Sequence, residues 1–147
     1  MTRSQRMEPV QKLTEERANA AAKAYGEARE RSEEQRRRLG QLTSFRDDYL
    51  SQRTSSGESG IDGFRLRDYN AFIARIDAAI QHQRGVIEQA EADAERLRKV
   101  WMELLGRARA VDKVVDRYQD EERRTEERRN QRQNDELAQR RRPLDLD

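Results

Sequence analysis

Residues 73–118 read IARIDAAIQHQRGVIEQAEADAERLRKVWMELLGRARAVDKVVDRY, and this stretch decides the fold. Counting alternately three and four residues from the first isoleucine gives fourteen positions, of which thirteen are apolar or aromatic. An apolar seam that recurs about every 3.5 residues is typical of a left-handed coiled coil. The stretch therefore predicts one long helix with a single seam for a partner helix. The fourteen seam positions are Ile73, Ile76, Ile80, Gln83, Ile87, Ala90, Ala94, Leu97, Trp101, Leu104, Ala108, Val111, Val115 and Tyr118.

The partner helix for this seam precedes it in the chain. Residues 54–63 read TSSGESGIDG, and glycines at this density mark a loop. We predict a loop over residues 55–63 between a first helix over about 9–54 and a second helix over about 64–140. Val10 and Leu13 lie outside the frame of the first helix, which predicts a slip of register near the N-terminus. The first helix has a weaker seam, apolar or aromatic at seven of ten positions: Ala18, Ala21, Tyr25, Ala28, Ser32, Gln35, Leu39, Leu42, Arg46 and Tyr49.

The short loop makes the two helices antiparallel neighbours. Folding at the glycines pairs residues whose numbers sum to roughly 118, so that Leu42 lies near Ile76. On this pairing the first helix ends near residue 109 of the second, and about 30 residues of the second helix project beyond it. The predicted fold class is all-α. Residues 1–147 are predicted to form a single coiled-coil domain, a long antiparallel two-helix hairpin with a projecting C-terminal helix.

The composition fits long paired helices better than a compact globule. Of the 147 residues, 41% are charged and 33% are hydrophobic, while the net charge is only +2. The chain has no cysteine and no apolar run long enough for a membrane span or a secretory signal. We therefore expect a cytoplasmic protein that reaches a membrane only through a partner. Because His82 is the only histidine, no P-loop is present and two helices offer no concave pocket, we predict no enzyme activity and no catalytic, cofactor-binding or metal-binding residues.

Two features of the sequence could bind other proteins. On the second helix, the column beside the seam is apolar at five of its seven positions, beginning with Phe72 and Ala79, and Phe45 joins it from the first helix. This flank is either part of a wider core or a groove for a partner. The second feature is the segment 119–142, which holds eight arginines and seven acids. It is either a solvated helix end or a tip that enters a polar cavity in a partner.

Three stretches of sequence and one tryptophan resemble one known family. They are residues 39–49 (LGQLTSFRDDY), residues 69–83 (YNAFIARIDAAIQHQ), Trp101, and residues 134–140 (NDELAQR), together with the position of the glycine loop. On these residues the chain resembles the FliJ family of the bacterial flagellar type III protein export apparatus. The resemblance implies an antiparallel coiled coil similar to the central stalk of rotary ATPases. It also implies a non-enzymatic protein that binds and stimulates the hexameric export ATPase ring, contacts the cytoplasmic domain of the export-gate membrane protein and escorts export chaperones. Such a protein lies in the cytoplasm, peripherally on the inner face of the inner membrane.

The resemblance also assigns residues to these contacts. Because the helix ends of family members reach into the ATPase ring, the charged segment supplies the ATPase-binding residues Arg123, Arg124, Glu126, Asp135, Glu136 and Arg140. The gate-binding patch of the family corresponds by position to Leu42, Tyr49, Phe72, Ile76, Ala79 and His82 or Gln83, to which Phe45 is added because it faces the same flank.

Two other functions remain open at this stage. A self-associating structural coiled coil would pair two hairpins through the apolar flank, whereas we expect a monomer in isolation. A nucleic-acid-binding helical rod would use the arginine clusters at residues 36–38, 123–124, 128–129 and 140–142. Nucleic-acid binders show a basic face with stacking aromatics, but here acids interleave with the arginines, so we expect no nucleic acid as a partner.

Overall fold

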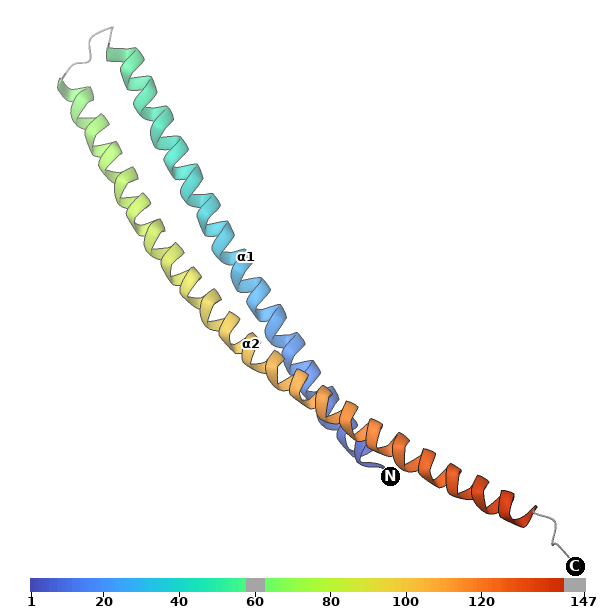
Figure 1. The fold of residues 1–147 in the computed structure, drawn as a ribbon. Coiled ribbons are helices and arrows are strands. Elements are labelled where there is room, and N and C mark those ends of the chain that lie inside the picture. Colours follow the sequence, from blue (N-terminus) through green and yellow to red (C-terminus); the bar gives the residue numbers. More distant parts are fainter. Residues whose placement is uncertain (58–62, 142–147) are drawn as a thin grey trace, which may run out of the picture. The chain divides into compact units, whose positions relative to one another are not determined.

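The computed structural model describes residues 1–57 and 63–141, which form two helices. Helix α1 spans Arg3–Gly57, with 55 residues, and helix α2 spans Gly63–Arg140, with 78 residues. The two helices pack against each other in antiparallel directions, and no strand occurs in the described residues (Figure 1). The all-α prediction is therefore confirmed. Of the loop predicted over 55–63, residues 58–62 lie outside the described residues, whereas its two ends belong to the helices.

The chain divides into two compact units, and each helix contributes to both. One unit is Ala20–Trp101, in which the two helices run side by side up to the loop (Figure 1). The other unit combines Met1–Asn19 with Met102–Asp147. In this second unit the first turns of α1 lie against α2, because the backbone N–H of Ser4 donates a hydrogen bond to the Glu122 carboxylate.

The seam predicted for α2 is confirmed by its burial. None of the fourteen positions is exposed, and the register extends upstream through Tyr69 and Leu66. Coiled-coil seams are narrow because each helix covers only one stripe of its partner. Accordingly, no large side chain in the described residues is completely enclosed. The most deeply buried seam residues of α2 are Ile76, Ile80, Ile87, Ala108 and Val115.

Small side chains dominate the seam of α1 where the helices are tightest. Ala18, Ala28 and Ser32 are all buried, with Ala28 only 1% exposed. The predicted slip of register is wrong, because Val10 and Leu13 are 43% and 45% exposed. The spacing of three and four residues continues without a break toward the N-terminus, and it places three polar side chains and one methionine in the seam: Ser4, Met7, Gln11 and Thr14.

Two of these polar seam residues, Ser4 and Gln11, make hydrogen bonds to α2. The Gln11 amide donates to the Asp112 carboxylate at 2.8 Å. The Ser4 hydroxyl donates to the Glu122 carboxylate at 2.7 Å. Burying polar groups is tolerated when they are hydrogen-bonded, so an apolar pattern alone misplaces the register here.

Helix α1 begins at Arg3, six residues before the position expected from the sequence. The backbone N–H of Gln5 donates to the Thr2 hydroxyl at 3.3 Å, and the Thr2 N–H donates to the Gln5 side chain at 3.0 Å. This reciprocal pair is a capping box, which satisfies two N–H groups at the helix start. Pro9 lies inside the helix on an exposed face, where the carbonyl it leaves unbonded can reach water.

The earlier start of α1 shortens the projecting part of α2. Near the loop, the stacking of Tyr49 on Tyr69 follows the predicted pairing. At the far end the offset has grown, since a sum of about 118 would place Ser4 opposite Val114 rather than Glu122. The unaccompanied segment therefore begins after Glu122, not near residue 109, and the estimate of about 30 projecting residues was too large.

Candidate functional site

Four aromatic rings near the loop end of the hairpin form a continuous row, here called the aromatic ladder: Phe45, Phe72, Tyr49 and Tyr69. The ring centroids of Phe45 and Phe72 lie 6.1 Å apart in an edge-to-face arrangement. Those of Phe72 and Tyr49 lie 4.4 Å apart, and Tyr49 stacks on Tyr69 at 4.9 Å. The ladder forms because residues four apart on α1 and three apart on α2 share one helix face.

The residues predicted to bind the export gate do not all reach the surface. Phe45 is 53% exposed, while Tyr49 and Phe72 are half-buried beside it. Ile76 lies buried in the seam. Gln83 is also committed to the hairpin, because its amide donates to the Gln35 backbone carbonyl at 2.9 Å. Leu42 and Ala79 are half-buried, as are Phe72 and Tyr49.

Two residues of this region were absent from the predicted site. Tyr69 completes the ladder and is 9% exposed. The Arg53 guanidinium lies over the Tyr69 ring, 4.5 Å from its centroid, which is cation–π geometry. The seam spacing was the signal that could have found both, since Tyr69 lies four residues before Ile73 and Arg53 lies four residues after Tyr49.

An ion pair flanks the ladder on the side away from the loop. The Arg46 Nε donates to an Asp77 carboxylate oxygen at 2.5 Å. This hydrogen bond, together with the charge of Asp77, raises the pKa of Arg46 above its ordinary value. Arg46 occupies a seam position, so the pair places a charged bridge in the seam close to the aromatic rings.

The apolar flank of α2 is partly covered by α1. Phe72, Ala79, Val86 and Val114 are half-buried, whereas Val100 is exposed. The flank is therefore neither fully buried as a core nor fully open as a groove. Near Phe72, the ring of Phe45 packs against the flank and remains in contact with solvent.

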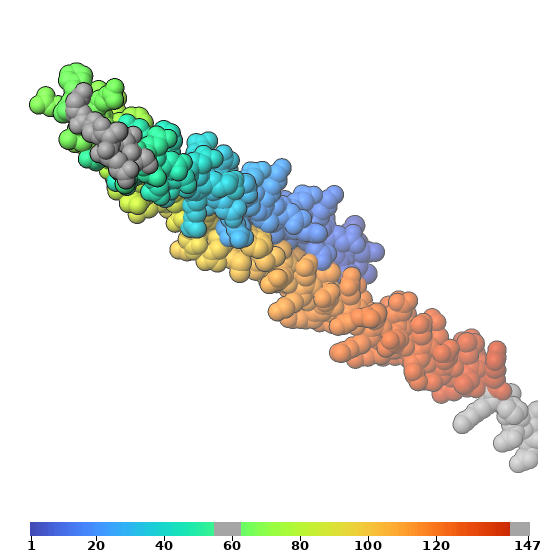
Figure 2. Space-filling view, turned by 90° about the horizontal axis from the view of Figure 1, so that it is seen from above, coloured from blue at the N-terminus to red at the C-terminus, as the bar shows by residue number. Residues whose placement is uncertain are grey.

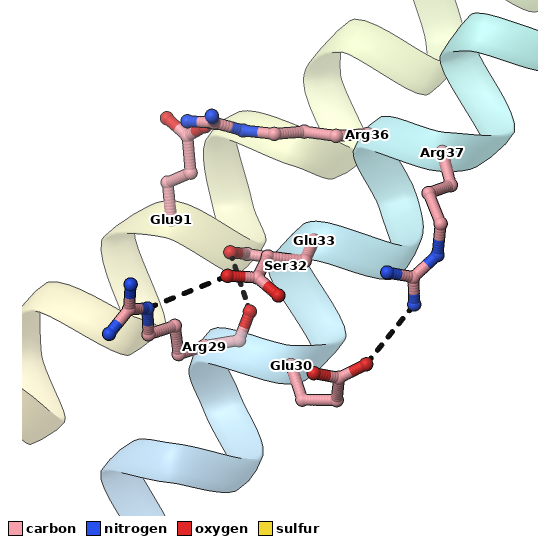
Figure 3. Close-up of polar contacts among 7 residues, drawn as sticks. All are labelled: Arg29, Glu30, Ser32, Glu33, Arg36, Arg37 and Glu91. Carbon is pink, nitrogen blue, oxygen red and sulfur yellow. Dashed lines mark hydrogen bonds and ion pairs between the residues drawn. The ribbon is translucent and has the colours of Figure 1, made fainter.

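The arginine cluster in the middle of α1 is paired with carboxylates. Arg36 reaches across to Glu91 on α2, its Nε donating at 2.8 Å, and Arg37 pairs with Glu30 at 3.1 Å (Figure 3). Arg38 pairs with a glutamate one turn before it at 3.7 Å. These exposed pairs each contribute about 0–1 kcal/mol, but together they leave this stretch without a bare basic face.

The C-terminal segment of α2, residues 123–140, is exposed at every position, as is residue 141 after it. In Figure 2 the end of this helix extends past the N-terminal turns of α1, which belong to the same unit. Arg123 pairs with Asp120 on its own helix, but the arginines at 124, 128, 129 and 132 have no ion pair among the described residues. The structure therefore keeps the predicted ATPase-binding residues on one helix and brings none of them against another segment: Arg123, Arg124, Glu126, Asp135, Glu136 and Arg140.

Glu122 marks the point where this exposed segment begins. It continues the seam column of α2, and its carboxylate receives the backbone N–H of Ser4 at 3.0 Å as well as the Ser4 hydroxyl. These bonds lower the pKa of Glu122, because they stabilise the charged carboxylate. The N-terminal turn of α1 also favours a negative charge at this place.

Within residues 1–57 and 63–141 there is no cluster of three or more side chains suited to a metal ion. Neither helix, in its described part, has a stretch both long and apolar enough to cross a membrane. The two surfaces differ in chemistry: the first has stacked rings with an adjacent cation, and the second has alternating charges along a helix.

Two long antiparallel helices that pack along one seam, with a charged end of the second helix beyond the first, place this chain in the class of antiparallel coiled-coil proteins. Comparison with known proteins identifies the family. The family model described as flagellar FliJ protein matches residues 3–142. The chain is 27% identical over 111 residues to a flagellar FliJ protein of Salmonella typhi, which covers 76% of each chain. No solved structure matches. The chain belongs to the FliJ family, whose members are components of flagellar protein export rather than enzymes.

Proposed function

We propose that this chain is the stalk-like coiled coil of the flagellar export apparatus, working in the cytoplasm at the inner face of the inner membrane. Its C-terminal segment binds the hexameric export ATPase and stimulates it. Its aromatic ladder contacts the cytoplasmic domain of the export-gate membrane protein. In the same place it escorts export chaperones to the gate.

The observation that carries the ATPase contact is the exposed helix from Arg123 to Arg140. A helix with no apolar face gains nothing by packing on its own chain, so this segment remains available to a partner. Exposed mixed charges form contacts of about 0–1 kcal/mol each, which suits a shaft that must not lock to one subunit of a ring.

The aromatic ladder supports the gate contact independently. Aromatic residues and arginines carry much of the binding energy of protein interfaces. Phe45 is half exposed beside Phe72, so it contributes little to hairpin pairing while offering a ring to a partner. This division between folding and binding is what the experiment measures.

The test compares two variants of the full chain. Deleting residues 123–147 should abolish stimulation of the ATPase and leave binding of the gate domain within about twofold. The double variant Phe45→Ala and Phe72→Ala should weaken gate binding about tenfold or more and leave stimulation intact. Val100→Ala, an exposed apolar position away from the ladder, serves as the control.

Full stimulation by the shortened chain would show that the charged segment is only a solvated helix end. Gate binding that survives loss of both rings would remove the ladder from that contact. Sedimentation of the intact protein should give a monomer, and a stable dimer would favour a self-associating structural coiled coil instead.

A further inference from the structure

Arg53 is a cation without a carboxylate partner in the described part of the chain. Eight arginines form ion pairs there, with carboxylates three to seven residues away or on the other helix, and Arg53 is among the arginines that do not. The Arg53 guanidinium instead covers the face of Tyr69 at the loop end of the aromatic ladder. The contact orients the side chain but uses none of its five N–H donors.

The Tyr69 hydroxyl on the same ring is also unsatisfied. It is buried and has no hydrogen-bond partner among the described residues. Buried polar groups are nearly always bonded, and one left without a partner destabilises the free protein. The charged Arg53 guanidinium and the neutral Tyr69 hydroxyl therefore lie at the same aromatic ring, and both lack a hydrogen-bond acceptor.

We infer that the protein surface covering the aromatic ladder presents a carboxylate, and that Arg53 and Tyr69 donate to it. This inference rests on the proposed gate contact. To the exposed rings of that contact it adds two hydrogen-bond donors, Arg53 and Tyr69, and one carboxylate of the partner. A carboxylate offers about four acceptor sites, so it can take a forked pair from the guanidinium and a third bond from the phenol. The inference requires that Arg53 leave the ring face as it pairs and that the Tyr69 hydroxyl, buried in the free chain, be uncovered on binding.

The geometry fixes where that carboxylate lies on the partner. Arg53 follows Phe45 by eight residues on α1, which corresponds to about 12 Å along the helix axis and about 80° around it. The partner therefore has an apolar pocket for the Phe45 ring and an acid about 12 Å from it. The rings between them exclude water and strengthen the ionic contact at the end.

The shape of the ladder favours a protein acid over an anionic membrane. Exposed charges of both signs lie close to the ladder in sequence, Asp47, Asp48 and Asp68 as well as Arg65 and Arg67, so they give an anionic bilayer no net attraction. A flat lipid surface provides no pocket for the exposed Phe45 ring, whereas a protein surface can provide both a pocket and a single acid directed at Arg53.

The test measures binding of the full chain to the cytoplasmic domain of the export-gate protein. Arg53→Gln should weaken binding about ten- to a hundredfold, and Arg53→Lys, which keeps the charge but not the fork, should be intermediate. Tyr69→Phe should weaken binding several-fold while its melting temperature stays the same or rises, because it removes an unsatisfied hydroxyl. The exposed Arg67→Gln on the same end of the hairpin is the control.

Opposite effects of Tyr69→Phe on binding and stability are the decisive result, since a merely structural tyrosine would not give them. Affinity should also fall with added salt more steeply for the natural chain than for Arg53→Gln. If Phe45→Ala weakens binding but Arg53→Gln and Tyr69→Phe do not, the acid is absent and the gate contact stands without it. If none of the three variants changes binding, the gate contact and this inference both fail. If Arg53→Gln abolishes self-association, the acceptor for Arg53 belongs to a second copy of this chain. If it abolishes binding to anionic vesicles, the acceptor is a lipid headgroup. Either result would overturn the inference.

Discussion

Replacing Trp101 with alanine tests the seam at its largest side chain. Trp101 is half-buried and stacks on Tyr25, with ring centroids 5.7 Å apart and planes 14° from parallel. A packed tryptophan buries about 150–250 Å², and the lower end of that range is worth about 4 kcal/mol at about 25 cal/mol per Å². Loss of the stack adds about 0.5–1.5 kcal/mol, while residual burial in the unfolded chain and the retained Cβ reduce the total.

We therefore expect Trp101→Ala to cost about 3–4 kcal/mol, which is the low end for a large aromatic residue. For a chain of this size the melting temperature should fall by about 6–16 °C. Thermal and urea unfolding followed by circular dichroism at the helix band would measure both quantities.

Met102 provides a matched control, because it is the next residue on α2 and is 49% exposed. Met102→Ala should cost well under about 1 kcal/mol. A Trp101→Ala protein as stable as the natural chain, or two variants with equal losses, would mean that the seam does not pass through Trp101. The double variant with Tyr25→Ala should lose less than the sum of the two single losses, because the stack can be broken only once.

Three further predictions concern other parts of the hairpin. Glu122 has a lowered pKa, so its contribution to the free energy of unfolding is present above the unfolded pKa of about 4.3 and is lost as the pH falls through the folded pKa. In urea titrations, Glu122→Gln should therefore be less stable than the natural chain at pH 7, and this difference should narrow below about pH 4.3. A difference that stays constant to pH 3 would remove the charged bond to the first turn of α1. Val10→Ser and Leu13→Ser should each cost under about 1 kcal/mol by thermal unfolding, and a loss near 3 kcal/mol would restore the slipped register. Gly85→Ala and Gly106→Ala should each raise stability by about 0.5–1 kcal/mol, because an added Cβ meets no atom within 4 Å and alanine favours the helix; a lower melting temperature would contradict this.

The start of α1 was readable in the sequence. Thr2 and Gln5 have the spacing of a capping box, and this local signal outweighs the breaking tendency of Pro9. The predicted start near residue 9 is six residues late, because it gives this cap no weight. The polar seam residues near that end were harder to find, since Ser4 and Gln11 join the seam only through carboxylates on α2.

The sequence by itself determined the helices, the seam of α2 and the exposure of its C-terminal segment. These follow from a periodicity within one helix, which depends on residues three and four apart and needs no knowledge of a partner. The placing of Ile76 and Trp101 toward α1 was predictable for this reason.

Only the tertiary structure decided which residues meet across the hairpin. The axial offset of two antiparallel helices is set by packing along their whole length, and it moved Ser4 from Val114 to Glu122. The same packing placed Arg53 over Tyr69 and left the Tyr69 hydroxyl without a partner. Such contacts join residues far apart in the chain, and no local periodicity encodes the distance between them.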